Sequence, residues 1–227
     1  MIKAIVTDIE GTTTSISFVH DVLFPYARQH MWAFITEHQN DADVSSYIAA
    51  VSKEAGRTLS IDETIDQLIA WIDADKKITP LKAIQGMLWE TGFKNGDYMA
   101  HLYNDAAEYL KNWHQQGIKL YVYSSGSVKA QQLLYGYSDH GDLTPLFSGY
   151  FDTEIGAKGD TSSYQHIVKT LGMDAKEVLF LSDIEAELDA AKNAGMHTYW
   201  LVRDQAPESG AAHPQVADFG AINLPAS

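Results

Sequence analysis

The feature that most constrains the fold is a series of four short apolar runs, each of which ends in polar residues. The runs occupy residues 2–7, 119–123, 178–181 and 197–202. Amphipathic stretches with helical spacing precede the last three runs, and each stretch ends at a glycine. Strands buried on both faces of a sheet read as continuous apolar runs, and parallel strands need crossover connections that are usually helical. The pattern therefore predicts an α/β protein with a Rossmann-like parallel sheet.

The long segment between the first and second runs carries helical periodicity in place of strand signals. Apolar residues recur at helical spacing over residues 19–37, 44–55, 61–75 and 81–91. We therefore expect a helical insertion at residues 15–100, while residues 1–14 and 101–227 form the α/β core. The stretch 205–227 is rich in alanine, proline and glycine, and we expect it to be edge structure or a loose tail.

The composition excludes several classes of function. The 227 residues include 16 Lys and Arg against 30 Asp and Glu, and the net charge of −14 repels nucleic acid and anionic membranes. Cysteine is absent, which excludes thiolate nucleophiles and thiolate metal sites and is compatible with a reducing compartment. No segment reaches the roughly 20 apolar residues of a membrane-spanning helix. We expect a cytoplasmic, monomeric enzyme or signalling module with no nucleic-acid or membrane partner.

Two acids follow the first apolar run. Asp8 and Glu10 are separated by one residue and precede Gly11, so their side chains point to the same side if strand geometry persists. In an open parallel sheet, ligands bind beyond the carboxyl ends of the strands. One carboxylate could then attack phosphorus while the other moves a proton to and from the leaving oxygen. The alternative is that Asp8 caps a turn and Glu10 lies in solvent.

Hydroxyl groups and further acids follow the second and third runs. Ser124 and Ser125 begin a turn, closed by Gly126 and Ser127, that could cradle phosphoryl oxygens. A serine N-cap for the next helix is the better explanation of this stretch in isolation, and both interpretations can hold together. Asp183 could join Asp8 in binding Mg²⁺, which prefers carboxylates, water and phosphate oxygens, and an N-cap is again the alternative. For Glu187, we prefer a stabilising role at the helix N-terminus over a contact with the site.

A lysine lies in a polar loop between two of these elements. Lys158 follows a strand expected near residues 150–152 and precedes the helix that leads to the third run. A lysine in this place can neutralise charge on a phosphoryl group during transfer, although most loop lysines are simply solvated. Chance rarely places acid, hydroxyl, lysine and acid at four corresponding positions, so the sequence favours one shared site.

These residues resemble a known family. The order of Asp8, Ser124, Lys158 and Asp183 is similar to the four motifs of the haloacid dehalogenase superfamily, which consists mostly of magnesium-dependent phosphatases with an aspartate nucleophile. Longer strings resemble the acireductone synthases, the bifunctional enolase-phosphatases of methionine salvage. The strings are DIEGTTT, FVHDVLFPYA, LKAIQGMLW, YVYSSGSVKAQQLLYG and FDTEIGAK. Glu10 also matches this family, because most other phosphatases of the superfamily carry Asp there.

The resemblance implies a haloacid dehalogenase-type core with the helical insertion as its cap. It also implies that the enzyme enolises 5-methylthio-2,3-dioxopentyl phosphate and then releases phosphate to form acireductone, 1,2-dihydroxy-5-(methylthio)pent-1-en-3-one. The group that removes the enolisation proton stays open. The implied catalytic residues are Asp8 as nucleophile, Glu10 as acid and base, and Lys158; the implied Mg²⁺ ligands are Asp8, the Glu10 carbonyl and Asp183; and the implied substrate-binding residues are Ser124, Ser125 and Lys158.

Two rival functions remain at this point. One is a haloacid dehalogenase-type phosphatase for another small phosphate ester. The other is a phosphoaccepting receiver-like signalling module, which also combines an aspartate, a hydroxyl, a lysine and a metal on a parallel sheet. The helical insertion and Glu10 argue against the receiver, because a signalling module needs a lasting acyl phosphate and not rapid hydrolysis.

Several side chains of the helical insertion have two interpretations. Trp32 and Phe34 are expected in the insertion's own core, because a small helical unit must bury aromatic groups. For Phe18 and Phe24, we leave open whether they belong to that core or to a substrate pocket. His20 could approach substrate or be a partly exposed polar residue.

Overall fold

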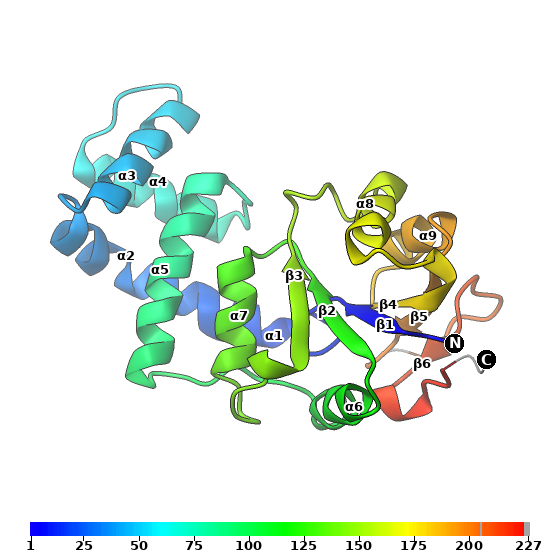
Figure 1. Ribbon diagram of the computed structural model, residues 1–227. Coiled ribbons are helices and arrows are strands. Elements are labelled where there is room, and N and C mark those ends of the chain that lie inside the picture. Colours follow the sequence, from blue (N-terminus) through cyan, green and yellow to red (C-terminus); the bar gives the residue numbers. More distant parts are fainter. Residues whose placement is uncertain (205, 225–227) are drawn as a thin grey trace. The chain divides into compact units, whose positions relative to one another are not determined.

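The computed structural model describes residues 1–204 and 206–224 (Figure 1). Its contacts divide the chain into two compact units, one formed by Met1–Ile16 with Ala100–Ser227 and the other by Ser17–Met99. All strands of the described residues belong to the first unit, and the described elements of the second unit are helices.

A parallel sheet forms the centre of the first unit. The described residues give six strands in the order β3-β2-β1-β4-β5-β6, and every neighbouring pair is parallel. The chain adds strands to one side of β1 and then to the other, so the strand order reverses between β1 and β4. The predicted parallel α/β sheet is therefore confirmed. The strands are β1 (Ala4–Thr7), β2 (Lys119–Tyr123), β3 (Phe147–Phe151), β4 (Val178–Ser182), β5 (His197–Leu201) and β6 (Gln215–Val216).

The register of the central strands aligns their carboxyl ends. Thr7, the last residue of β1, lies opposite Val122 of β2 and Leu181 of β4. The residues that follow these three strands are therefore brought to the same edge of the sheet. In a sheet of this type, this edge, at the point where the strand order reverses, is where ligands bind.

Helices cover both faces of the sheet (Figure 1). On one face, Val6 and Phe180 of the sheet pack in a buried cluster with Tyr164 of α8 and Leu188 of α9. On the other face, α6 contacts β2. Because both faces are covered, every residue of the central strands β1 and β4 is buried, which explains their continuous apolar runs. The helices are α6 (Asn104–Gln115), α7 (Val128–Gly136), α8 (Thr161–Leu171) and α9 (Glu185–Asn193), with 3₁₀ turns η2 (Thr144–Leu146), η3 (Ala175–Glu177) and η4 (Phe219–Ala221).

The segment after β5 returns to the sheet edge. Its described part, residues 206–224, contains β6 and η4, so it includes the edge structure that we expected. His213 anchors this segment, because its buried ring contacts Thr198 Oγ1 at 2.7 Å and Asp189 Oδ1 at 3.0 Å. Gln205 and residues 225–227, which the same expectation covered, lie outside the described residues.

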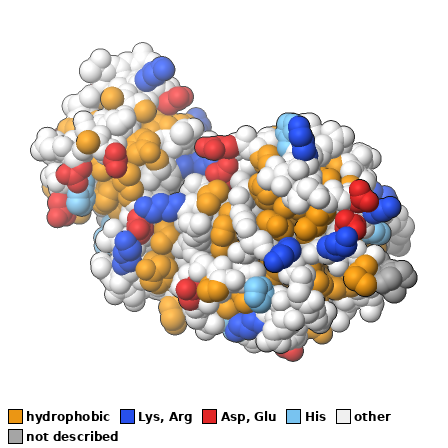
Figure 2. Space-filling model, in the orientation of Figure 1, with side chains coloured by type: hydrophobic (Ala, Val, Ile, Leu, Met, Phe, Trp, Pro, Cys, Tyr) orange, Lys and Arg blue, Asp and Glu red, His pale blue; other side chains and the backbone are white. Residues whose placement is uncertain are grey.

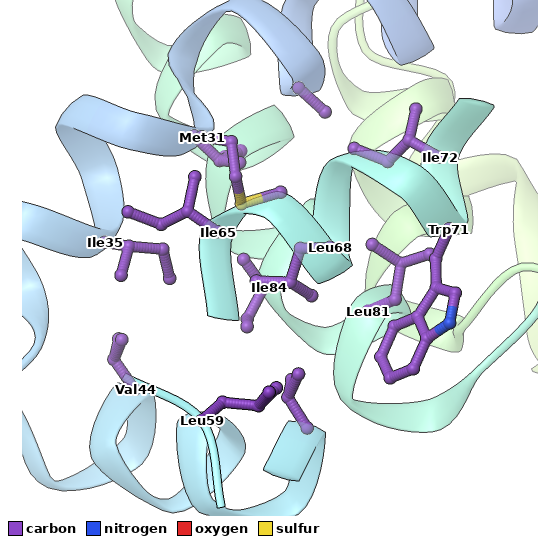
Figure 3. Close-up of a cluster of buried hydrophobic side chains, with 13 residues drawn as sticks. Met31, Ile35, Val44, Leu59, Ile65, Leu68, Trp71, Ile72, Leu81 and Ile84 are labelled. Atoms are coloured by element: carbon purple, nitrogen blue, oxygen red, sulfur yellow. The ribbon is translucent and has the colours of Figure 1, made fainter. Parts of the chain in front are cut away.

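The second unit has an apolar core of its own (Figure 3). Met31 and Ile35 of α2, Leu68 of α4 and Ile84 of α5 are fully buried and point toward one another. α4 begins at a capping box in which Ser60 and Glu63 exchange hydrogen bonds between side chain and backbone. The elements are α1 (Ile16–Phe18), the π-helical turn η1 (Val19–Leu23), α2 (Phe24–His38), α3 (Ala42–Glu54), α4 (Ile61–Asp73) and α5 (Thr79–Asn95).

The expectation that Trp32 lies in this core is wrong, because its side chain is 60% exposed. The buried residues of α2 are Ala27, Met31 and Ile35, which follow one another at intervals of four. Trp32 is one position further and therefore lies about 100° around the helix from Met31. Phe34 is partly buried and packs against the core, as we expected.

The other aromatic groups of this unit pack against one another. Phe18 is buried and contacts the Tyr98 ring edge-on, with 6.4 Å between ring centroids. Phe24 stacks on Trp89 at 6.5 Å and packs against the apolar core. His20 is exposed, and its ring contacts Phe24. Within the unit, Phe18 and Phe24 therefore both have packing roles.

Two properties of the surface complete the description. None of the helices in the described part of the chain combines the length and the apolar character that a membrane span requires. On the face drawn in Figure 2, Lys and Arg side chains are interspersed with Asp and Glu, and no continuous basic patch forms there.

Candidate active site

The carboxyl ends of three neighbouring strands carry the candidate site. Asp8 directly follows β1, Ser124 follows β2 and Asp183 follows β4. The Asp8 N–H donates to the carbonyl of Leu181 at 2.9 Å, so the sheet hydrogen bonding extends to this residue. The backbone of Asp8 is therefore held as firmly as the strand, and its side chain is placed where the strand order reverses.

Lys158 pairs with two buried carboxylates. Its Nζ donates to Asp8 Oδ1 at 2.6 Å and lies 2.8 Å from Glu187 Oε2. The three side chains are between 5% and 13% exposed. Burial lowers the pKa of the Lys158 ammonium, but the charges and hydrogen bonds of Asp8 and Glu187 outweigh this effect and raise the pKa above its ordinary value. Lys158 is therefore a fixed positive charge beside Asp8, and the alternative of a solvated loop lysine is wrong.

Tyrosine hydroxyls fasten the loop that carries this lysine. Tyr164 Oη donates to the Lys158 carbonyl at 2.7 Å, and Tyr123 Oη donates to the Gly156 carbonyl at 2.9 Å. Both tyrosines belong to the buried cluster beneath the loop. A loop without regular structure is thus attached to the rigid core, which fixes the direction of the lysine side chain.

Glu187 has a larger role than the sequence suggested. It lies in the first turn of α9, as expected, but its carboxylate pairs with Lys158 and accepts a hydrogen bond from Ser182 Oγ at 2.8 Å. The preference for a role limited to the helix N-terminus was therefore wrong. Burial raises the pKa of Glu187, and the negative charge of Asp8 raises it further. No signal in the sequence indicated that this side chain turns toward the lysine.

Asp183 lies against the tight turn that follows Asp8. Gly11 has φ +72°, and a Cβ added to it would lie 2.5 Å from Asp183 Cγ and closer still to Oδ2. Only glycine fits here, both for its backbone conformation and for space. Asp183 does not cap α9, because Ile184 is the N-cap residue of that helix. The N-cap alternative for Asp183 was therefore wrong.

The acids of this site fit a divalent cation. Burial and then the charge of Asp8 raise the pKa of Asp183 to about 7. Asp183 Oδ1 is buried and has no hydrogen-bond partner among the described residues. A cation would bind this oxygen and remove the repulsion between the carboxylates. The described residues contain no group of three or more Asp, Glu or His side chains arranged for a metal, so carbonyl, water or substrate oxygens would complete the ligands.

Glu10 lies where the strand has given way to a turn. Gly11 N–H donates to the Thr14 carbonyl at 2.8 Å, and Glu10 forms an isolated bridge with Thr14. β1 ends before this point, so alternation along a strand does not fix the direction of Glu10. Burial raises the pKa of Tyr135, and the negative charges of Asp8 and Glu10 raise it further. Tyr135 Oη shares a 2.9 Å hydrogen bond with Thr13 Oγ1.

The serines after β2 have different structural roles. Ser127 caps α7, because its side chain accepts a hydrogen bond from the Ala130 N–H at 3.2 Å. The expected serine N-cap for this helix is therefore confirmed at Ser127, and Ser124 and Ser125 do not cap it. Ser124 is buried, and its Oγ accepts from the Gly126 N–H at 3.2 Å, which closes a tight turn. Gln131 supports the same turn by donating to the Gly126 carbonyl at 2.9 Å.

Sequence reasoning did not identify Arg203, Tyr135 or Gln131. Arg203 donates to the carbonyl of Thr12, 191 residues earlier in the chain. Its position follows the fourth apolar run, where a polar residue at a strand end is the signal that could have been used. Tyr135 and Gln131 lie on one helix and gave no such signal.

Comparisons with known proteins agree with this architecture. A family model for haloacid dehalogenase-like hydrolases matches residues 2–195. The chain is 53% identical over 224 residues to the enolase-phosphatase E1 of Thioalkalivibrio sulfidiphilus, and the aligned region covers 99% of this chain and 100% of the relative. It is 55% identical over 223 residues to that of Methylococcus capsulatus, with 98% of each covered. The crystal structure of the UTR4 protein of Saccharomyces cerevisiae superposes with a TM-score of 0.83 at 32% identity, covering 98% of this chain and 100% of that chain.

The likeness extends over both units of the chain and is too close to fit the receiver-like alternative. Enzymes of this family typically use a divalent metal ion, in agreement with the paired acids of the site. The resemblance read from the sequence motifs is confirmed. The chain therefore belongs to the enolase-phosphatase E1 family of the haloacid dehalogenase-like hydrolases.

Proposed function

We propose that this enzyme converts 5-methylthio-2,3-dioxopentyl phosphate to acireductone and inorganic phosphate in methionine salvage, with Mg²⁺ as its metal ion. One observation carries the proposal. The Asp8 carboxylate is held by Lys158 beside Asp183, at the end of the central strand, in a chain whose relatives are named enolase-phosphatases. Mg²⁺ suits this site because it is commonly bound by one or two carboxylates together with water and phosphate oxygens.

The phosphatase half of the reaction uses Asp8 as nucleophile. One oxygen of its carboxylate accepts the hydrogen bond from Lys158, and the other attacks phosphorus. The bond between phosphorus and the substrate oxygen breaks, and Glu10 gives that oxygen a proton. Water then attacks the aspartyl phosphate, Glu10 takes the proton from the water, and phosphate is released. Ser124 and Ser125 bind the phosphoryl oxygens, and Lys158 neutralises their charge.

The enolase half moves a proton from carbon to oxygen. A hydrogen on the carbon next to a carbonyl is removed, and the carbonyl oxygen becomes the enol oxygen. When bound, the cation would act as a Lewis acid that polarises this carbonyl. Glu10 helps to move the proton, since its side chain is one methylene longer than the Asp found in most phosphatases of the superfamily.

The test follows enol absorbance and free phosphate in the same reaction. The wild-type enzyme should form enol before phosphate, and phosphate release without an enol would show an ordinary phosphatase. Asp8→Asn should lose multiple-turnover phosphate release with the fold retained, whereas Asp66→Asn at an exposed position of α4 should not change it. Excess EDTA should abolish activity and Mg²⁺ should restore it; activity that persists in EDTA would reject the metal.

We further propose that Ser17–Met99 is the cap of the haloacid dehalogenase fold and that the enzyme is a cytoplasmic monomer. Two features support the cap: the unit is inserted between β1 and β2, and it has an apolar core of its own. Sedimentation equilibrium should give a single species near 25.1 kDa, and a mass that rises with concentration would reject the monomer.

A further inference from the structure

Arg203 connects the end of β5 to the loop that follows β1. Its Nε and Nη2 donate to the Thr12 carbonyl at 2.9 and 2.6 Å, and its Nη1 donates to Asp105 Oδ1 at 2.9 Å. The guanidinium carbon lies 3.8 Å from the centroid of the Tyr103 ring and 5.3 Å from that of Phe219. The side chain is 8% exposed, so a buried cation is fixed by hydrogen bonds in its plane and by rings against its faces.

Asp105 braces this guanidinium. While Oδ1 accepts from Arg203, Oδ2 accepts from the Phe219 N–H at 2.8 Å. Burial acts to raise the pKa of Asp105, but the hydrogen bonds and charge of Arg203, together with the Phe219 N–H, outweigh it and hold the pKa below its ordinary value. The carboxylate therefore remains ionised and orients Arg203 toward Thr12.

The carbonyl that Arg203 binds belongs to the turn that carries the acids. Thr12 N–H donates to the Ile9 carbonyl at 3.1 Å, and Gly11 N–H donates to the Thr14 carbonyl at 2.8 Å. Glu10 and Gly11 lie inside this turn, and Gly11 is in contact with the Asp183 carboxylate. A rotation of the Thr12 peptide would therefore move the Glu10–Gly11 backbone, which follows Asp8 in the chain and contacts Asp183. Two hydrogen bonds from one planar group fix both the position and the direction of a carbonyl, which one ammonium donor does not do.

We propose that Arg203 is a positioning residue for the metal site and the acids. Braced by Asp105, it holds the Thr12 carbonyl and so keeps the Glu10–Gly11 backbone in the conformation that places Asp8 and Asp183 for a divalent cation. Arg203 itself touches neither substrate nor metal. This inference deepens the proposed function and rests on the metal dependence that it assigns.

The test measures Mg²⁺ binding apart from turnover. Mg²⁺ is titrated by calorimetry into the metal-free wild type, Arg203→Met and Arg203→Lys, and kcat and KM are then measured with the diketone phosphate. Residues that support metal ligands typically change metal affinity by about 10–100-fold. We expect a loss of about that size for Arg203→Met, a smaller loss for Arg203→Lys, and a fall in kcat that exceeds any change in KM.

Thr198→Val is the matched control, because it removes a buried hydrogen bond to His213 in the same unit without touching the turn. It should lower Tm and leave the Mg²⁺ affinity unchanged. Wild-type Mg²⁺ affinity and kcat in folded Arg203→Met, or an equal loss in Thr198→Val, would overturn the proposal. If Arg203→Met does not fold, Asp105→Asn replaces it with the same expectation and the same refuting result. A wild type that binds Mg²⁺ but releases no phosphate would instead refute the proposed function, and the affinity comparison would still decide the role of Arg203.

Discussion

Replacing Gly11 by alanine would place a methyl group against the Asp183 carboxylate. The added Cβ would lie 2.5 Å from Asp183 Cγ, which is closer than non-bonded carbon atoms approach, so one of the two residues must move. The turn around Gly11 is held by its own hydrogen bonds and by those from Arg203 to the Thr12 carbonyl, whereas Asp183 Oδ1 has no hydrogen-bond partner in the described part of the chain. Asp183 is therefore the group that we expect to move.

The expected loss of stability comes mainly from the backbone. Gly11 has φ +72°, and alanine in the left-handed region costs about 1–2 kcal/mol relative to glycine. For a protein of this size, about 1 kcal/mol lowers Tm by about 2–4 °C, which gives a fall of about 2–8 °C. Movement of Asp183 toward water also relieves the burial that raises its pKa, and this relief partly offsets the strain of the contact.

The matched control is Gly117→Ala, in the same unit. Gly117 has φ +82°, and nothing lies within 4 Å of the Cβ that the substitution would add. We expect both variants to lose a similar amount of thermal stability, but only Gly11→Ala to lose phosphate release and Mg²⁺ affinity, each by at least about 10-fold. Thermal unfolding, calorimetry and a phosphate assay measure the three quantities. Wild-type turnover in Gly11→Ala would refute the reasoning that this contact sets the position of Asp183.

Three further predictions concern the buried charges and the helical unit. The pKa of Asp183 is raised from 3.8 to about 7, so between these pH values the folded state keeps a proton that the unfolded state loses. In EDTA, the Tm of the wild type relative to that of Asp183→Asn should therefore fall as pH rises from 4 to 8. A Tm difference that stays constant over this pH range would contradict the prediction. Lys158→Met leaves the buried carboxylates of Asp8 and Glu187 without their cation. Urea unfolding at pH 8 should show a loss of about 3 kcal/mol in the free energy of unfolding, and phosphate release should be lost as well. An unchanged free energy of unfolding would show that the ion pairs do not form. Leu68→Ala removes a fully buried side chain and should destabilise the protein by about 2–5 kcal/mol, whereas exposed Trp32→Ala should stay within about 0.5 kcal/mol; equal effects on urea unfolding would contradict the assigned core.

The sequence was sufficient to predict the sheet and the convergence of Asp8, Lys158 and Asp183. The reason is that the carboxyl ends of parallel strands share one edge of the sheet. Residues that follow apolar runs can therefore be predicted to lie near one another even when the directions of their side chains are unknown. Lys158 was placed correctly near this edge, although its two partners could not be deduced. Pairing with Glu187 depends on how α9 is rotated against β4, and no local pattern encodes that rotation.

The errors at other positions have related physical causes. The expected burial of Trp32 failed because a helix with several large apolar residues has more than one possible buried face, and an error of one residue turns the face by about 100°. The role of Arg203 was not predicted because its partner, Thr12, is 191 residues away in the chain. Contacts of that range become visible only when the strand order is known.

The position of β1 in the sheet also affects how the chain is synthesised. β1 is a central strand, yet its two neighbours, β2 and β4, begin at Lys119 and Val178. On the ribosome, the first strand must therefore remain without its partners until most of the chain has emerged. The helices of Ser17–Met99 differ in this respect, because the residues of their apolar core all come from that one continuous segment. Long-range parallel pairing of this kind is slow and leaves apolar segments exposed while it forms, so the sheet around β1 is the part of the fold whose formation depends on the most distant contacts.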